Sequence, residues 1–503
     1  MKNIFLLLFF IKTSLVVAQA GSLDNSFDSD GKNTYCFASI VDGNTLDGGF
    51  QSSSKIVQLF YDATNPIKLL RWNNNGSLDT TFGTSGVQIH SNIPPFNNGG
   101  YYPSKMVIQP DDKIIIMGLQ QNNTYPNAYW IARLLPNGAL DTSFNGTGYK
   151  DLSFGTLQDR GTCVALQADG KILLGGTSGN TAEFFTVARL NSNGTLDTGF
   201  GSGGKAQISF NGAESFVQSM AVQTDDKIVL GGYTVSSAKD FALARVYSNG
   251  TLDTSFGING KVITTLNTSY SDLITDLVIE PNGNIIAGGF TSSENNPWMC
   301  MVRYTSNGTV DTSFGTNGVV INNDDNSRSC TLARQVDGKI IMGGCFDGTF
   351  FIVARYNNNG AKDTGFGTNG FVNPFPLIYS YAAKILIQPD NKIVVSGWTT
   401  SATNQACAAV IRLNAGTLGV EEFERGNVVI YPNPSTGLVA IKMSYLDLQK
   451  YTCTVYNLLG QKIMEQNDVV NNTSLDLSDI RKGTYIISLT SLNNKITKTI
   501  VLE

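Results

Sequence analysis

The stretch GTLDTSFGING, Gly250–Gly260, decides the fold, because six further versions of it occur along the chain. Each version begins and ends with glycine and has an aspartate in fourth place and a phenylalanine in seventh place. The seven aspartates are Asp24, Asp79, Asp141, Asp197, Asp253, Asp311 and Asp363, at intervals of 52 to 62 residues. This period is too long for a leucine-rich or ankyrin solenoid and is typical of one four-stranded propeller blade per repeat.

The repeat at residues 216–260 shows how the strands are expected to follow one another. Short apolar or alternating runs predict four strands, at Ser219–Gln223, Lys227–Tyr233, Phe241–Tyr247 and Gly260–Thr264. Asn249-Gly250 is expected to form the tight turn after the third strand, because this pair supplies the positive φ that hairpin turns require. The double glycine in the second strand is expected beside a crowded central axis, where side chains have no room.

Each predicted third strand carries an arginine, and the two ends of the pattern complement each other. The seven arginines are Arg71, Arg133, Arg189, Arg245, Arg303, Arg355 and Arg412. No arginine precedes Asp24, and no aspartate follows Arg412. A ring would join these two halves, whereas a solenoid would need capped ends. The sequence therefore predicts an all-β fold: a seven-bladed β-propeller over residues 21–419, closed by pairing of Gly21–Gly31 with the Arg412 strand.

The repeated side chains are interpreted as packing residues. Each aspartate is expected to cap its own turn and to pair with the arginine of its blade, while each phenylalanine is buried between blades. The alternative is a ring of seven carboxylates that binds a metal. Repetition in every blade favours packing, because a binding site is normally unique, and the calcium-loop pattern is absent from these turns. We therefore predict no metal ligands and no cofactor.

The repeat also resembles a known family. The patterns R-x-N-x-N-G-x-L-D-x-x-F-G and Q-x-D-x-K-I-x-x-G-G are similar to those of the delta-60 repeat family of bacterial secreted proteins, over Gly21–Leu418. This resemblance implies a propeller fold and no particular reaction.

Residues 1–20 have the features of a secretory signal. Lys2 precedes the apolar run Ile4–Ile11, and Ala18-Gln19-Ala20 is a small-x-small cleavage site. We expect cleavage between Ala20 and Gly21. An uncleaved membrane anchor is the alternative, but the apolar run is short for a span of ~30 Å of hydrocarbon.

The repeat stops after Gly419, and a second domain follows. Residues 420–427 contain the charged run EEFER and are expected to be a linker. Alternating apolar residues over residues 428–503 predict antiparallel strands with one solvated face, in a small β-sandwich. One interpretation of residues 428–503 is a small β domain that binds a ligand of its own.

Four motifs of this second domain resemble the C-terminal sorting domain of the type IX secretion system. They are YPNPSTG (Tyr431–Gly437), LLGQ (Leu458–Gln461), GTYIISL (Gly483–Leu489) and the closing KITKTIVL (Lys495–Leu502). The resemblance implies a Bacteroidetes-type cell and contact between residues 428–503 and the type IX machinery. It also implies removal of the domain as the protein is released or attached to the outer cell surface.

The seven cysteines show no metal-binding or redox motif. There is no CxxC, and the spacings fit no zinc site. Most cysteines are expected to be small buried residues in strands. Cys330 and Cys345 bracket one predicted hairpin, so a disulfide between them is one interpretation.

The composition restricts the possible functions. The net charge of −5 and the lack of a basic tract argue against nucleic acid as a partner. His90 is the single histidine and lies in an insertion, which argues against Ser-His-Asp chemistry and histidine-ligated metals. No nucleophile elbow or phosphate-binding loop occurs. We therefore predict a protein that is not an enzyme, has no catalytic residues and serves as a secreted or surface scaffold that binds an unidentified extracellular glycan or protein.

A glycan-active hydrolase that uses carboxylates is the alternative function, because propellers host such chemistry. It would place two acidic residues, unique to one blade, at the mouth of the central channel, whereas a scaffold would show only repeated residues there. If one site binds a ligand, Phe96, Tyr101 and Tyr102 are the expected contacts, because the insertion at residues 92–103 departs most from the repeat.

Overall fold

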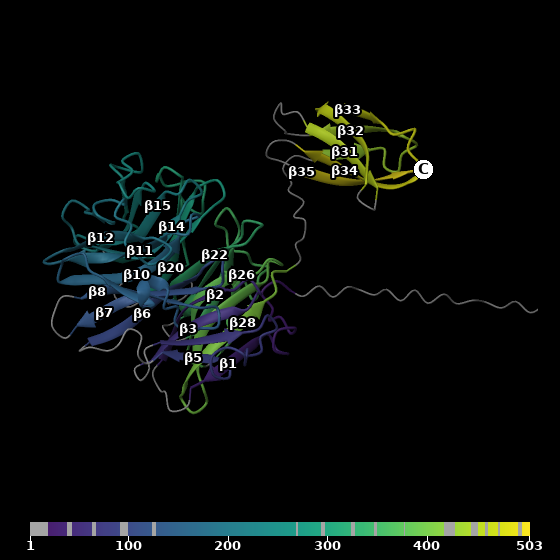
Figure 1. The fold of residues 1–503 in the computed structure, drawn as a ribbon. Coiled ribbons are helices and arrows are strands. Elements are labelled where there is room, and N and C mark those ends of the chain that lie inside the picture. The colour runs from purple at the N-terminus through teal and green to yellow at the C-terminus, as the bar shows by residue number, and fades with distance from the viewer. Residues whose placement is uncertain are drawn as a thin grey trace, which may run out of the picture. The chain divides into compact units, whose positions relative to one another are not determined.

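The computed structural model describes residues 19–37, 43–62, 67–90, 99–122, 127–267, 270–292, 297–322, 327–346, 350–376, 378–416, 428–443, 451–457, 461–470, 473–490 and 495–503. The chain divides into two compact units, residues 1–417 and 418–503 (Figure 1). Within the described ranges the elements are strands, apart from one 3₁₀ turn, η1, at Phe144–Gly146. The all-β prediction is therefore confirmed.

Seven four-stranded antiparallel sheets form the described part of the first unit. Sheets one to three contain β2 (Gly43–Phe50), β3 (Ile56–Asp62), β4 (Ile67–Trp72) and β5 (Val87–His90); β6 (Gly99–Ile108), β7 (Ile114–Asn122), β8 (Ala128–Leu134) and β9 (Tyr149–Leu152); and β10 (Gln158–Leu166), β11 (Ile172–Gly179), β12 (Glu183–Leu190) and β13 (Lys205–Ile208). Sheets four and five contain β14 (Ser215–Val222), β15 (Ile228–Val235), β16 (Lys239–Val246) and β17 (Lys261–Thr264); and β18 (Ser271–Ile279), β19 (Ile285–Ser292), β20 (Pro297–Tyr304) and β21 (Val319–Ile321). Sheets six and seven contain β22 (Ser327–Arg334), β23 (Ile340–Phe346), β24 (Phe350–Tyr356) and β25 (Phe371–Val372); and β26 (Ser380–Ile387), β27 (Ile393–Thr400), β28 (Ala406–Leu413) and β1 (Lys32–Cys36).

Sheet seven combines the two ends of the first unit (Figure 1). Strand β1 pairs with β28, so that Cys36 lies opposite Cys407. Just before β1, the Asp24 N–H donates to the Arg412 carbonyl at 2.9 Å, and Arg412 Nε lies 2.6 Å from Asp24 Oδ2. The expected pairing of the N-terminal segment with the Arg412 strand is therefore present.

The first strands of successive sheets pack beside one another. Strand β2 contacts β6, and the contacts continue through β10, β14, β18 and β22 to β26. Strand β26 in turn contacts β2. We call these seven strands the inner strands.

The signature residues act as the sequence predicts. In sheet four, Arg245 Nε lies 2.8 Å from Asp253 Oδ2, and the Ser255 N–H donates to the other carboxylate oxygen at 3.1 Å. Phe256 is fully buried, and the Arg245 guanidinium lies 4.6 Å from its ring centre. The other six pairs, at 2.6 to 2.8 Å, are Arg71–Asp79, Arg133–Asp141, Arg189–Asp197, Arg303–Asp311, Arg355–Asp363 and Arg412–Asp24.

Local charges keep these carboxylates ionised. Burial by itself would raise the pKa of Asp24, but hydrogen bonds from Lys392 and Ser26 and the charge of Arg412 lower it far below the usual value. A buried carboxylate that is so strongly paired contributes to folding, and removal of its partner cation is costly.

The double glycines have a different cause from the one expected. A side chain at Gly232 would overlap the carbonyl of Phe216 on the adjacent strand, where the pairing of β14 with β15 shifts by one residue. A Cβ at Gly231 would lie 2.9 Å from Leu277 of sheet five. Side chains at the two glycines are therefore excluded by the bulge in the inner strand and by the neighbouring sheet, rather than by crowding at the central axis.

A disulfide joins Cys36 of β1 to Cys407 of β28. The sequence did not predict it, because the two cysteines are 371 residues apart and belong to no motif. Cys163, Cys300, Cys345 and Cys453 are buried, as expected for small strand residues. The side chain of Cys330 lies outside the described residues, so its pairing with Cys345 stays a prediction.

Gln19 and Ala20 form hydrogen bonds with Gly367 of the last signature segment. In other sheets the equivalent backbone bond comes from the Asn-Gly turn of the next repeat. The Ala20 carbonyl accepts the Gly367 N–H at 2.8 Å, as the Asn359 carbonyl accepts that of Gly315 at 2.8 Å. The Gln19 side-chain amide donates to the Gly367 carbonyl at 3.0 Å.

A chain that begins at Gly21 is therefore expected to be less stable than one that begins at Gln19, by about 0.5–1.5 kcal/mol. Thermal denaturation of the two purified versions measures the difference. Identical melting temperatures would show that these bonds contribute nothing. N-terminal sequencing of the secreted protein shows whether the expected cleavage before Gly21 removes them.

The second unit has two sheets. One contains β29 (Val428–Tyr431), β30 (Leu438–Met443) and β33 (Thr473–Asp476), and the other contains β32 (Lys462–Val469), β31 (Tyr451–Asn457), β34 (Gly483–Thr490) and β35 (Lys495–Leu502). Ile441 and Leu475 from the first sheet share one buried cluster with Val455 and Ile487 from the second. This is the arrangement expected of a small sandwich. Among the described residues of both units, no helix is long and apolar enough to cross a membrane.

Candidate functional site

One position near the start of the inner strands differs from sheet to sheet. In each sheet the residue at this position pairs with one residue of the second strand. That partner comes directly after the double glycine, or after the equivalent two residues where the double glycine is replaced. The residues at this position, which we call the rim residues, are Asn44, Tyr102, Arg160, Phe216, Leu273, Arg328 and Tyr381 in sheets one to seven. All are exposed or partly exposed, and they vary where the packing residues repeat. A functional site that is unique in the molecule therefore has its best place here.

A buried carboxyl group lies beside the rim residue of sheet three. Glu183 is the first residue of β12 and is 8% exposed. Arg160 Nη2 lies 3.4 Å from Glu183 Oε1, while Oε2 has no hydrogen-bond partner among the described residues. At the equivalent start of the third strand, sheets four, five and seven carry Lys239, Pro297 and Ala406. Glu183 is therefore a departure from the repeat rather than part of it.

Sheet four supplies an aromatic pair and further charges. The rings of Phe216 and Tyr233 stack with centres 4.9 Å apart, and Lys239 Nζ lies 4.9 Å from the centre of Tyr233. The Glu214 carbonyl accepts the Val235 N–H at 2.8 Å, which holds the backbone of this exposed glutamate directly before β14. We use the name rim cluster for Arg160, Glu183, Glu214, Phe216, Tyr233 and Lys239.

Electrostatic interactions connect the two sheets at the rim cluster. Burial raises the pKa of Glu183, the nearby Glu214 raises it further, and Arg160 opposes both. Burial also raises the pKa of Tyr233, with contributions from the charges of Glu183 and Arg160. A carboxyl group that holds its proton above the ordinary pH range of glutamate is suited to general acid–base catalysis. The stacked rings offer the flat apolar surface, with a polar edge, that a sugar ring can pack on.

A second group lies at the rim of sheets five to seven. The Arg328 guanidinium lies 5.6 Å from the ring centre of Phe290, and its charge lowers the pKa of Tyr381, which burial raises. Arg328 is exposed.

The residues expected to contact a ligand are only partly described. Phe96 lies outside the described residues, and Tyr101 is in β6 with its side chain outside them. Tyr102 is the rim residue of sheet two, and its ring centre lies 5.9 Å from that of Tyr61. A ligand role for the three stays a prediction. His90 is buried, with Nε2 2.9 Å from the Gly138 carbonyl, and burial lowers its pKa.

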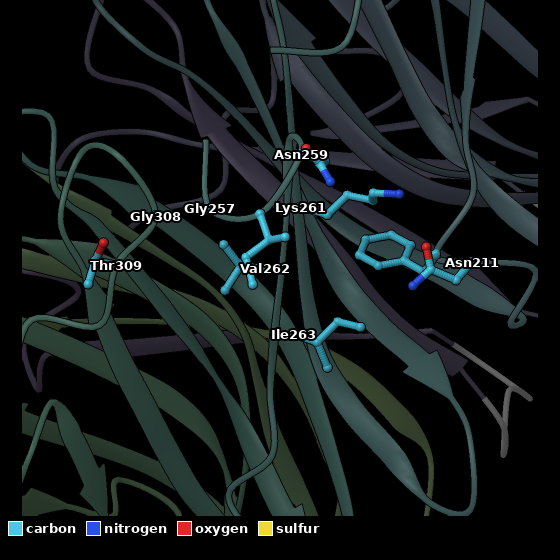
Figure 2. Close-up of a pocket in the computed structure, with 10 residues that line it drawn as sticks. Asn211, Gly257, Asn259, Lys261, Val262, Ile263, Gly308 and Thr309 are labelled. Carbon is cyan, nitrogen blue, oxygen red and sulfur yellow. The ribbon is translucent and has the colours of Figure 1, made fainter. Parts of the chain in front are cut away.

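A groove of about 450 Å³ lies between sheets four and five (Figure 2). Val262 and Ile263 line it from β17, and Gly308 lines it from the next repeat. A second groove has the equivalent residues Val320, Ile321 and Gly360 in its wall. Because the same repeat positions form both, the grooves are seams between sheets and carry no chemistry unique to one place.

Among the described residues no group of three or more histidine, cysteine or acidic side chains is placed to hold a metal ion. The two acidic residues of the rim cluster also do not come from one blade, as we expected for a hydrolase. Glu183 belongs to sheet three and Glu214 precedes sheet four, so only the folded structure brings them together. The sequence does contain one indication of this site. Glu183 begins the third strand of its repeat, where other repeats carry lysine, proline or alanine.

Comparison with protein families defines the class of the chain. Six segments match the domain of unknown function DUF5122 β-propeller, at residues 109–144, 167–200, 223–256, 280–314, 335–366 and 388–416. Residues 429–503 match the secretion system C-terminal sorting domain. The chain is therefore an all-β protein of propeller-like repeats that ends in a secretion sorting domain. The sorting domain assigns it to export, to the cell surface or the extracellular space, and to interaction with the secretion machinery.

The relatives with known names include enzymes. Over 88 residues, the chain is 31% identical to Ulvan lyase NLR42 from Nonlabens ulvanivorans, and the match covers 17% of this chain and 16% of the relative. Similar solved structures include a polysaccharide lyase of family PL25, an ulvan lyase bound to a sugar (11% identity, 79% and 96% of the two chains, TM-score 0.43), and Sqt1 from Chaetomium thermophilum (11%, 79% and 98%, TM-score 0.46). At these TM-scores the structural likeness carries no argument about activity.

The prediction that the chain is not an enzyme is contradicted. The segment shared with an ulvan lyase points to a possible enzyme. The prediction rested on the lack of a suitable histidine and of an acidic pair within one repeat, and neither absence excludes an enzyme. In the structure, Glu183 and Glu214 of the rim cluster come from neighbouring repeats, and Glu183 is buried beside Arg160.

Proposed function

We propose that this chain is an exported propeller enzyme that cleaves an extracellular glycan at the rim cluster. The observation that supports it most strongly is the buried carboxyl group of Glu183 next to Arg160. Its pKa is raised, and one of its oxygens has no hydrogen-bond partner among the described residues. The ulvan lyase that shares a segment with the chain supports a polysaccharide as the substrate class.

The proposed site lies at one end of a closed, seven-bladed ring. The contacts of β26 with β2, the pairing of β1 with β28 and the Cys36–Cys407 disulfide support this closure. The rim residues then surround the mouth of the central channel, where propellers offer a concave site for ligands.

Each member of the rim cluster has a defined chemical role in this proposal. Glu183 donates a proton to the oxygen of the leaving sugar as the glycosidic bond breaks. Phe216 and Tyr233 stack on a sugar ring, while Arg160 and Lys239 bind its polar groups. Glu214 is the second carboxylate, which a hydrolytic mechanism would use as base or nucleophile.

The proposal includes the processing of the chain. Residues 1–20 are removed as a signal peptide between Ala20 and Gly21. The secretion machinery then recognises residues 428–503 and removes them in the linker at residues 420–427, which leaves the propeller in the medium or on the cell surface.

Purified propeller should be incubated with a panel of neutral, uronate-containing and sulfated polysaccharides. We expect at least one polysaccharide to lose viscosity and to yield new chain ends. New reducing ends alone indicate hydrolysis, and ultraviolet absorbance of an unsaturated uronyl end indicates elimination. If every polysaccharide remains intact, the proposed activity is wrong.

A further inference from the structure

We infer that the glycan is a polyanion, held by two arginines of the rim that are three sheets apart. This inference rests on the proposed function of the rim and specifies its substrate class. Arg160 and Arg328 occupy the same register position in sheets three and six. They are the two charged side chains among the seven rim residues, and both are exposed.

The charge of Arg328 is available to a ligand. No described carboxylate lies within ion-pair distance of its guanidinium, which instead lies over the ring of Phe290 at 5.6 Å. The arginines of the signature are different, because each is paired with an aspartate at 2.6 to 2.8 Å. An exposed guanidinium placed by an aromatic ring is preorganised to bind a carboxylate or sulfate through two parallel hydrogen bonds.

The charge of Arg160 is only partly compensated. Its partner Glu183 lies at 3.4 Å, and the Arg160 side chain is 46% exposed, so an anionic ligand can still reach the guanidinium. Lys239 adds a second cation over Tyr233, and Glu214 is the exposed carboxylate of the cluster.

The residues between the two arginines fit the rest of a sugar chain. Phe216 and Leu273 are the rim residues of sheets four and five, so apolar side chains separate the two cationic positions. A polysaccharide with acidic groups on separated sugars would place them at the arginines and the sugar faces on the apolar residues. A neutral glycan would leave both guanidinium groups without an anion.

Binding of dextran sulfate, polygalacturonate and neutral dextran to the full mature propeller tests the inference. We expect dextran sulfate or polygalacturonate to bind, more weakly as salt is added, and neutral dextran not to bind. The first polymer offers sulfate and the second carboxylate, so the comparison identifies the anionic group. Equal binding of neutral dextran would overturn the inference.

Substitutions then locate the anion sites. R160Q and R328Q are each expected to weaken binding about tenfold, and the double variant more than either, whereas R160K and R328K retain part of the affinity because they keep the charge. N44A is the matched control, an uncharged change at the same register position, and should bind as the original does. Unchanged binding by the folded double variant, checked by its melting curve, would overturn the inference.

Failure of this inference and failure of the proposed activity are distinguishable. If polyanions bind through the two arginines but no polysaccharide is cleaved, the rim is an anion site and the proposed activity is wrong. If a neutral glycan is cleaved and the arginine variants act normally, the activity stands and the polyanion inference is wrong.

Discussion

Arg412→Ala is expected to lower the free energy of unfolding by about 3 kcal/mol, because it leaves the buried Asp24 carboxylate without its closest cation. The guanidinium also donates to the Asn74 carbonyl at 2.6 Å and to Ser26 Oγ at 2.9 Å. Lys392, at 2.8 Å from Asp24, remains and limits the loss. Urea denaturation of the oxidised protein measures the change.

Arg245→Ala is the matched control for this prediction. Arg245 and Asp253 form the same pair within one repeat, whereas Arg412 and Asp24 come from opposite ends of the unit. If the N-terminal segment closes the ring, the two substitutions should be similarly destabilising. A clear loss for Arg245→Ala with little change for Arg412→Ala would show that the ends are not joined and that the rim does not form a complete ring.

Glu183→Gln is expected to reduce the rate of glycan cleavage by about 10²- to 10⁴-fold, because glutamine keeps the shape of the side chain and cannot donate the proton. The rate on the polysaccharide that the panel identifies measures this loss. Binding of that polysaccharide should persist, since Arg160, Phe216 and Tyr233 remain. Undiminished cleavage by the variant would remove Glu183 from the mechanism.

The same variant has a stability signature that tests the raised pKa of Glu183. Because the pKa of Glu183 is raised in the folded chain, its contribution to stability falls as the pH rises above the ordinary value of a glutamate. Glutamine has no such dependence. Glu183→Gln should therefore be more stable than the original protein at neutral pH and equally stable at a pH below that ordinary value, as urea denaturation at both pH values shows.

The repeated features of the fold could be predicted from the sequence because each was present several times. An arginine, an Asn-Gly turn and an aspartate eight residues later appear in successive repeats, and the structure pairs them as expected. The missing partners of Asp24 and Arg412 likewise predicted that the ends would meet. The cause of the double glycines could not be predicted, since it depends on a one-residue shift in the pairing of β14 with β15.

The features that occur once were harder to predict. Cys36 and Cys407 meet only because β1 and β28 pair in one particular register. The rim cluster combines Arg160 and Glu183 of one sheet with Tyr233 of the next, so it has no spacing that a motif could reveal. Tyr102 was selected from the longest insertion and is a rim residue, but the contacts of the described residues place it beside Tyr61 and outside the rim cluster.

The most direct test of the account is a crystal structure of the Glu183→Gln protein with an oligosaccharide of the polysaccharide that it cleaves. We predict a sugar ring packed against Phe216 and Tyr233, with a glycosidic oxygen within hydrogen-bond distance of the side chain at position 183. An oligosaccharide bound elsewhere, for example in the groove lined by Val262 and Ile263, with the rim empty, would contradict it.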